Sequence, residues 1–134
     1  MHLTQLNIVK RYYEHFNNKD YNGMVALLAD DVAHNINQGT REMGKEKFLQ
    51  FLIRMDKHYD ETVEELVLFS ASEPGRIAAE FIIQGRYQQT EPGFPQARGQ
   101  SYRISVGAFF HVQNELIKRV TNYYNVNAWR KSVE

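Results

Sequence analysis

The sequence predicts an α+β domain in which helices come first and consecutive antiparallel strands follow. Apolar residues recur at helical spacing in the first half, and from residue 62 polar and apolar residues alternate with the period of a strand. All three prolines lie in the segments that separate the later alternating runs, where they do not interrupt a sheet. This order is typical of helices packed on one face of a curved sheet.

The composition fits one globular domain, 1–134, with a sizeable core. Acidic and basic residues balance at 16 each, without the basic surplus that nucleic acids and anionic membranes attract, so we expect neither partner. The absence of cysteine excludes disulfides and thiol chemistry and fits a reducing compartment. With no signal-peptide pattern and no long apolar run, we expect a cytoplasmic protein.

Three helices are predicted in the first half of the chain. The first covers residues 3–18 and the third residues 45–59. Between them, Asp20 is a suitable N-cap for a short second helix, because its carboxylate can accept free N–H groups of the first turn. The three apolar stripes are Leu6, Val9, Tyr12, Tyr13 and Phe16; Tyr21, Met24, Val25, Leu27 and Leu28; and Phe48, Phe51, Leu52, Met55 and Tyr59.

Residues 30–39, with the sequence DDVAHNINQG, carry polar side chains where a buried strand would ordinarily be aliphatic. We interpret this stretch as a short strand that forms the polar floor of a pocket. Alternation points His34 and Ile36 inward. Asn35 and Asn37 are expected to face away or to shape the bend at the end of the strand.

Turn residues separate four predicted strands in the second half of the chain. Before the third helix, residues 39–44 are expected to form a loop in which Arg41 and Glu42 pair in solvent. Gly85 and Gly107 lie inside long strands and are candidates for the β-bulges that curve a sheet. The strands are predicted at residues 62–71, 76–90, 100–113 and 116–126.

Aromatic side chains are expected on both faces of the sheet. Neighbours on a strand point to opposite faces, and the doublets Phe109-Phe110 and Tyr123-Tyr124 therefore place a ring on each. Helices cover one face, and the other combines rings with Gln and Arg, a composition typical of protein interfaces. We therefore predict a homodimer through the outer face of the sheet.

Several polar side chains are expected on the inner face, where they need partners or a ligand. His34 is the preferred general base, Tyr12 the donor to a ligand carbonyl, and Asn122 the residue that orients one of them. For each, the alternative is a structural hydrogen bond or a place in the core. The expected lining of the ligand pocket is Phe16, Ile36, Gln38, Met55, Tyr59, Phe81, Tyr87, Tyr102, Phe110 and Tyr124.

Two groups of motifs carry a resemblance to known families. Residues 11–32, with RYY, FN and the run GMVALLADDV, look like the opening of the nuclear-transport-factor-2-like superfamily, which includes ketosteroid isomerase and SnoaL-type polyketide cyclases. The segments HNINQG, RGQSY, GAFF and RVTNYYN resemble a ketosteroid-isomerase-related subgroup of unsettled function. The resemblance implies a cone-shaped barrel with three N-terminal helices on a strongly curved, mainly antiparallel sheet, an internal pocket and, usually, a dimer.

The resemblance also permits a comparison with the ketosteroid isomerase reaction, which uses an Asp base and an oxyanion hole of Tyr and protonated Asp. The hole tyrosine corresponds to Tyr12, the base to Ile36 and the protonated Asp to Ala108. Because Ile and Ala cannot exchange protons, the usual steroid isomerase mechanism does not fit this chain. Relatives often have Asp at the position of Asn35, so the polar pattern differs there too.

We expect a small-molecule-binding domain that, if it is an enzyme, moves a proton on a hydrophobic carbonyl compound as an isomerase, cyclase or hydratase. The alternative is a non-catalytic ligand sensor or dimeric interaction module of the same fold. The five histidines lack close ligand spacing and no glycine-rich phosphate loop is present, so we expect no metal and no cofactor. Residues 91–95 are expected to form either a lid, with Phe94 as its apolar cover, or an ordinary hairpin connection.

Overall fold

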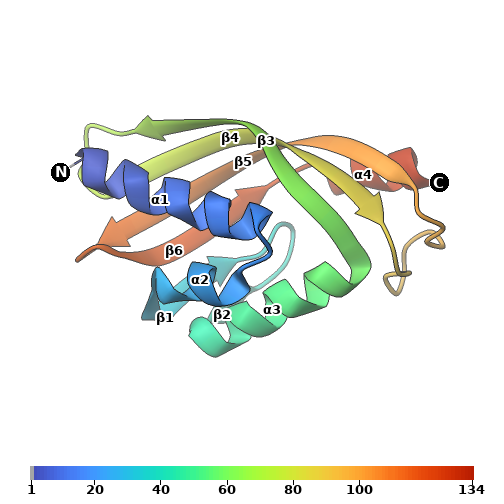
Figure 1. The fold of residues 1–134 in the computed structure, drawn as a ribbon, viewed down its shortest axis with the longest axis horizontal. Helices are drawn as coiled ribbons and strands as arrows, with labels where there is room; N and C mark the ends of the chain where they lie inside the picture. The colour runs from blue at the N-terminus through green and yellow to red at the C-terminus, as the bar shows by residue number, and fades with distance from the viewer. Residues whose placement is uncertain (1) are drawn as a thin grey trace.

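Six strands form one mixed sheet, and helices lie against its inner face and at one end (Figure 1). The computed structural model describes residues 2–134. The elements are α1 (His2–Asn17), α2 (Tyr21–Ala26), β1 (Leu28–Asn35), β2 (Arg41–Met43), α3 (Lys45–His58), β3 (Tyr59–Ser70), β4 (Arg76–Tyr87), β5 (Ser101–Gln113), β6 (Leu116–Tyr123) and α4 (Val126–Val133). The predicted α+β class is confirmed.

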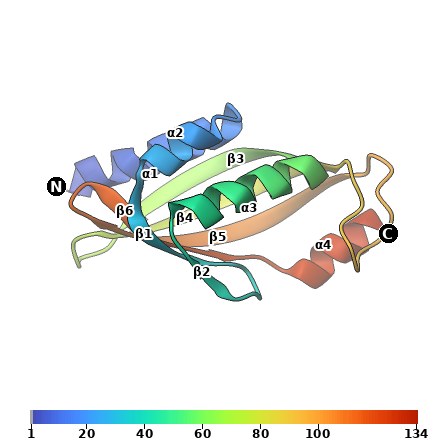
Figure 2. The same cartoon turned by 90° about the horizontal axis from the view of Figure 1, so that it is seen from below.

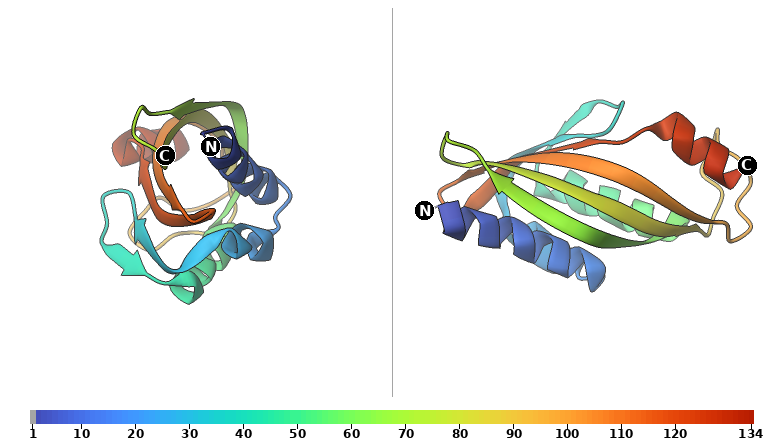
Figure 3. Two further views of the ribbon diagram at one scale, coloured as in Figure 1. Left: turned by 90° about the vertical axis from the view of Figure 1, so that its left-hand side faces the viewer. Right: turned by 90° about the horizontal axis from the view of Figure 1, so that it is seen from above.

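The strands follow the order β2-β1-β6-β5-β4-β3, so β2 and β3 are free edges. β1 and β6 run parallel, and every other pair is antiparallel. The sheet is curved but does not close, and the predicted barrel is not confirmed (Figure 3). Closure would require β2 to meet β3, whereas the short β1–β2 hairpin projects away from the remaining strands (Figure 2).

The predicted N-terminal helices correspond to α1, α2 and α3, and Asp20 caps α2 by accepting the N–H of Gly23 at 2.9 Å. The set of three helices is incomplete, because α4 was not predicted. The predicted strand at 116–126 ends at Tyr123, and the side chain of Asn125 starts α4 by accepting the N–H of Ala128. Trp129 of α4 is buried at the end of the sheet.

Part of the predicted loop 39–44 is β2, which pairs with β1. Arg41 and Glu42 are neighbours on this strand and therefore point to opposite faces. They form no ion pair, and Arg41 instead donates from Nε to Oδ1 of Asn35 at 2.8 Å. The expected solvated pair is therefore wrong.

Gly85 and Gly107 do not form bulges, because the β4–β5 ladder runs through both without a register shift. Gly85 is required for a different reason. A Cβ atom there would collide with the ring of Tyr102, which crosses Gly85 to reach Glu61. These three residues are cross-strand neighbours on β3, β4 and β5.

The core lies between the helices and the inner face of the sheet. Alternation sorts β4 and β5 as predicted, with the inward residues mostly buried and the outward ones half-buried or exposed. Within residues 2–134, no helix has the length and apolar character needed to cross a membrane. The largest fully buried side chains are Tyr87, Phe48, Phe110, Met24, Leu28, Ile117, Val9, Val32, Val120 and Val133.

Candidate functional site

His34 lies on the inner face of β1 and is only 2% exposed. Its ring packs against Phe48 and Phe51 of α3, with centroid distances of 4.3 and 4.7 Å. Nδ1 of His34 is buried and has no hydrogen-bond partner. Burial disfavours the charged ring and lowers the pKa of His34 to about 4, so the imidazole is neutral at pH 7.

Tyr12 lies on the buried side of α1, where its ring makes edge contacts with Tyr13 and Phe110 at 5.1 and 5.3 Å. Burial raises the pKa of Tyr12 well above its ordinary value, so the phenol stays protonated and can only act as a donor or neutral acceptor. Tyr12 and His34 each contact Phe48, but no hydrogen bond joins them in the described part of the chain.

Asn122 lies on β6, two residues beyond the cross-strand neighbour of His34. It is the cross-strand neighbour of Ala108 and lines a hollow of about 400 Å³ at the ends of β1 and β6. Of the predicted pocket residues, Ile36 and Gln38 line the same hollow. Of the three residues predicted to act together, only Asn122 lines this hollow.

A second group of predicted residues forms an aromatic cluster at the end of the sheet covered by α4. Tyr59 stacks on Tyr87 with a centroid distance of 5.6 Å and an interplanar angle of 14°. Trp129 contacts both rings edge-on and also approaches Tyr102 at 6.0 Å. Phe94 packs on Trp129 at 5.4 Å, so the loop after β4 lies over this cluster.

Glu61 and Tyr102 form a hydrogen-bonded pair beside the aromatic cluster. The phenol of Tyr102 donates to Oε2 of Glu61 at 2.6 Å. Burial raises the pKa of Glu61 above its usual 4.5, although the hydrogen bond from Tyr102 and the charge of Lys19 act in the opposite direction. Burial and the Glu61 charge raise the pKa of Tyr102 far above its ordinary value. A carboxyl group with a raised pKa beside a protonated phenol is typical of proton-transfer sites.

Glu61 was not predicted as a site residue, because the first strand of the second half was expected to begin at residue 62. β3 begins at Tyr59, and alternation from there points Glu61 inward with Val63. The two inward neighbours of Glu61 across the sheet are Gly85 and Tyr102. An inward carboxylate next to a strand glycine was the signal that could have identified this pair.

Glu91 is a buried carboxylate, and it anchors the loop after β4. Arg54 donates to its Oε1 at 2.8 Å, and His58 Nε2 lies 3.3 Å from its Oε2. Nδ1 of His58 lies 2.9 Å from the carbonyl of Gln89, so that nitrogen carries the hydrogen. Because the Arg54 hydrogen bond and a second bond from the Glu91 N–H to the Tyr87 hydroxyl hold Glu91 in place, we assign it a structural role.

The remaining predicted pocket residues lie in different environments. Phe81 and Phe110 are buried core residues that pack on Tyr13. Phe16 and Met55 are half-buried on the helices. Tyr124 lies just beyond β6 and is 37% exposed.

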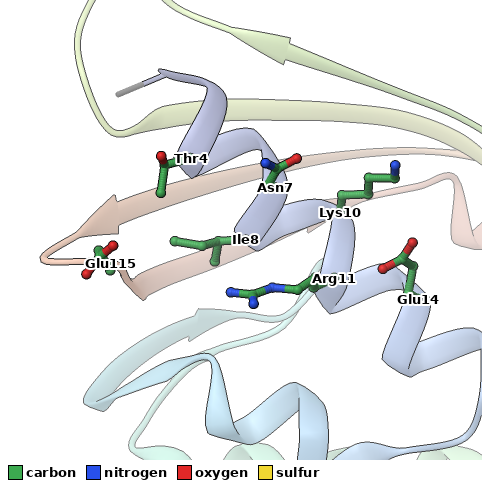
Figure 4. Close-up of a pocket in the computed structure, with 7 residues that line it drawn as sticks. All are labelled: Thr4, Asn7, Ile8, Lys10, Arg11, Glu14 and Glu115. Atoms are coloured by element: carbon green, nitrogen blue, oxygen red, sulfur yellow. The ribbon is translucent and has the colours of Figure 1, made fainter.

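A further hollow of about 570 Å³ lies on the outer side of α1, where it meets the β5–β6 hairpin (Figure 4). It contains none of the residues predicted to bind a ligand. Within residues 2–134, no group of three His, Asp or Glu side chains is placed to hold a metal ion. The lining of this hollow is Thr4, Asn7, Ile8, Lys10, Arg11, Glu14 and Glu115.

Comparison with known proteins identifies the family. The SnoaL-like domain model matches residues 9–120. A proposed polyketide cyclase from Xanthomonas campestris pv. campestris is 43% identical, with a TM-score of 0.96 over 99% of this chain and 98% of that chain. Another from Pseudomonas putida KT2440 is 42% identical, with a TM-score of 0.91 over 95% and 96% of the two chains.

More distant structures share the fold. An LEH-like epoxide hydrolase from M. tuberculosis is 15% identical, with a TM-score of 0.73 over 98% of this chain and 90% of that chain. A search of the curated proteins gives no match. The chain belongs to the SnoaL-like domain family.

Proposed function

We propose that this domain binds a small hydrophobic compound with a carbonyl group and moves a proton on it through Glu61 and Tyr102. The observation that carries the proposal is their 2.6 Å hydrogen bond beside an aromatic cluster. Similarity to proposed polyketide cyclases supports the substrate class, because polyketides are rich in carbonyl groups. Aromatic walls with a few polar groups are typical of ligand sites.

The reaction uses the two side chains in different roles. The Glu61 carboxylate accepts a proton from the carbon next to the carbonyl, and the electron pair of the broken C–H bond moves to the carbonyl oxygen as an enolate. Tyr102 redirects its O–H from Glu61 to that oxygen and stabilises the charge. Where the compound has a carbon–carbon double bond next to the deprotonated carbon, the electron pair extends over that bond, and Glu61 returns the proton to its far carbon, which completes an isomerisation without a cofactor.

The assignment of His34 as the base, with Tyr12 as the carbonyl donor and Asn122 as the orienting residue, is a second proposal for the same reaction. The unpartnered Nδ1 of His34 supports it, because a buried polar atom without a partner is costly unless a ligand pairs with it. The two assignments are distinguished by which variant loses activity.

The test uses hydrogen–deuterium exchange next to the carbonyl of hydrophobic ketones and diketones, followed by NMR. Glu61→Gln should slow exchange about 100-fold, the usual contribution of a general base, while His34→Gln retains the rate. Glu80→Gln, which changes an exposed carboxylate on the outer face, is the matched control. A full rate in Glu61→Gln overturns the proposal, and loss in His34→Gln alone favours the second assignment.

Ligand binding can be followed separately from catalysis. Trp129 is the only tryptophan of the chain and lies 6.0 Å from the Tyr102 ring. A ligand at this pair should therefore change tryptophan fluorescence. Binding without exchange in the wild type would favour the non-catalytic alternative, a ligand sensor of the same fold.

We also propose that the outer face of the sheet associates with a second copy. Phe109 and Tyr123 are 45% and 59% exposed there and contact each other. Arg119 lies on one side of this apolar patch and Glu80 on the other, so a twofold-related copy brings these opposite charges together, whereas Glu64 and Glu65 are already paired with Arg103. Phe109→Lys should convert a dimer to a monomer in sedimentation analysis, and a wild-type monomer contradicts the proposal. The flanking residues are Arg76, His111 and Arg119, and Glu64, Glu65 and Glu80.

A further inference from the structure

The hollow of about 400 Å³ beside the β1–β2 hairpin has a chemistry unlike that of the Glu61–Tyr102 pair. Its walls are the hairpin turn, the end of β6 and the Arg41 side chain. Cross-strand pairing places Arg41, Asn35 and Thr121 in one row on β2, β1 and β6. The full lining is Asn35, Ile36, Gln38, Gly39, Thr40, Arg41, Thr121, Asn122 and Tyr123.

Hydrogen bonds fix the side chains of this row and leave some of their hydrogen-bond donors without a partner. Asn35 accepts from Arg41 Nε at 2.8 Å and donates from Nδ2 to Thr121 Oγ1 at 2.8 Å. Arg119 also donates to Thr121 Oγ1, at 2.7 Å. A hydroxyl oxygen accepts two hydrogen bonds, so both acceptor positions of Thr121 are used and its own O–H is left to donate. Thr121 is 5% exposed, which makes an unused donor there costly.

Positive charge in this region has no local counterion. Among residues 2–134, no carboxylate lies within ion-pairing distance of Arg41 or Arg119. Burial and then the charges of Arg76 and Arg41 lower the pKa of the Arg119 guanidinium. Arg76 is paired with Glu73 at 3.2 Å, so the uncompensated pair is Arg41 and Arg119.

We infer that this hollow binds the carboxylate of a small organic acid. The unpaired N–H groups of Arg41 and the O–H of Thr121 supply the donors, and the Arg119 charge adds attraction from beside the hollow. A volume of about 400 Å³ exceeds that of a carboxylate alone, and Ile36 and Tyr123 provide apolar surface for the group attached to it. The site shares no residue with the Glu61–Tyr102 pair, and of its lining only Asn122 belongs to the second assignment of the proton transfer.

The test measures binding of sodium benzoate to the full chain by calorimetry at constant ionic strength. Wild-type protein should bind it saturably. Thr121→Val, which keeps the shape of the side chain, and Arg41→Gln, which changes an exposed side chain, should each weaken binding about tenfold or more, the effect of losing one charge-assisted hydrogen bond. Arg11→Gln is the matched control, because Arg11 lines the separate hollow on α1.

Absence of saturable benzoate binding, or equal binding by Thr121→Val and Arg41→Gln, overturns the inference. Binding of inorganic phosphate without binding of benzoate overturns the assignment to a carboxylate. The final measurement is the oligomeric state by sedimentation. If benzoate dissociates a dimer and Arg41→Gln does the same, the natural occupant is a carboxylate of a second copy, and the assignment to a small acid fails.

Discussion

Adjacent residues on one strand point to opposite faces of the sheet, and the side chains on the two faces differ in chemistry. On β1, His34 points inward and is neutral because burial lowers its pKa, whereas Asn35 points outward and organises charged donors. On β5, Tyr102 points inward to Glu61, whereas Arg103 points outward to Glu64 and Glu65. On the inner face, burial determines the protonation states of the side chains. On the outer face, the balance of positive and negative charges determines how the side chains interact.

The largest expected effect concerns His34 and the pH dependence of stability. Its pKa is about 4 in the fold against 6.5 for an ordinary histidine, so its contribution is complete above pH 6.5 and is lost as the pH falls through about 4. The difference corresponds to about 3 kcal/mol of unfolding free energy. Between pH 6.5 and 4, the unfolding free energy measured by urea denaturation should therefore fall much less for His34→Gln than for the wild type.

The outer-face histidine provides the control for this comparison. Burial and the Arg76 and Arg119 charges also lower the pKa of His111, but that side chain is only half-buried, so His111→Gln should change the pH dependence less. Equal effects of the two substitutions would show that burial does not separate the two faces.

The second prediction tests the close approach of Tyr102 to β4. Gly85→Ala should lower the unfolding free energy by about 1–3 kcal/mol, because the new methyl group forces the Tyr102 ring out of its place. Gly107→Ala is the control, since a Cβ there has no neighbour within 4 Å. If chemical denaturation gives the two variants the same stability, the position of the Tyr102 ring does not depend on Gly85.

The third and smallest effect concerns the charge balance of the outer face. Asn35→Asp places a carboxylate beside Arg41 and should weaken benzoate binding about tenfold through lost donors and repulsion. Trp129 fluorescence should remain unchanged, because Trp129 lies in the inner cluster. If Asn35→Asp changed both benzoate binding and Trp129 fluorescence, the two faces of the sheet would be coupled.

The elements that could be predicted from the sequence are those with a long regular period. α1, α3, β4 and β5 have such patterns, and their positions agree with the prediction. β2 is only three residues long, too short for a period to be visible. α4 was not predicted, although Val126, Trp129 and Val133 have helical spacing after the cap at Asn125.

The candidate site was predicted in part. Tyr102 was identified as an inward residue by alternation, but its partner Glu61 was missed with the start of β3. The inward position of His34 is confirmed by its burial, whereas its lack of a partner depends on how α3 packs Phe48 and Phe51 around it. Such packing depends on residues distant in sequence and cannot be obtained from a local pattern.

The most direct measurement is the NMR titration of the Glu61 side-chain carboxyl in the folded protein. Its midpoint should lie above 4.5, because burial outweighs the hydrogen bond from Tyr102. Tyr102→Phe removes that bond and should raise the midpoint further. A midpoint at or below 4.5, or one that does not respond to Tyr102→Phe, would contradict a buried acid–base pair on the inner face.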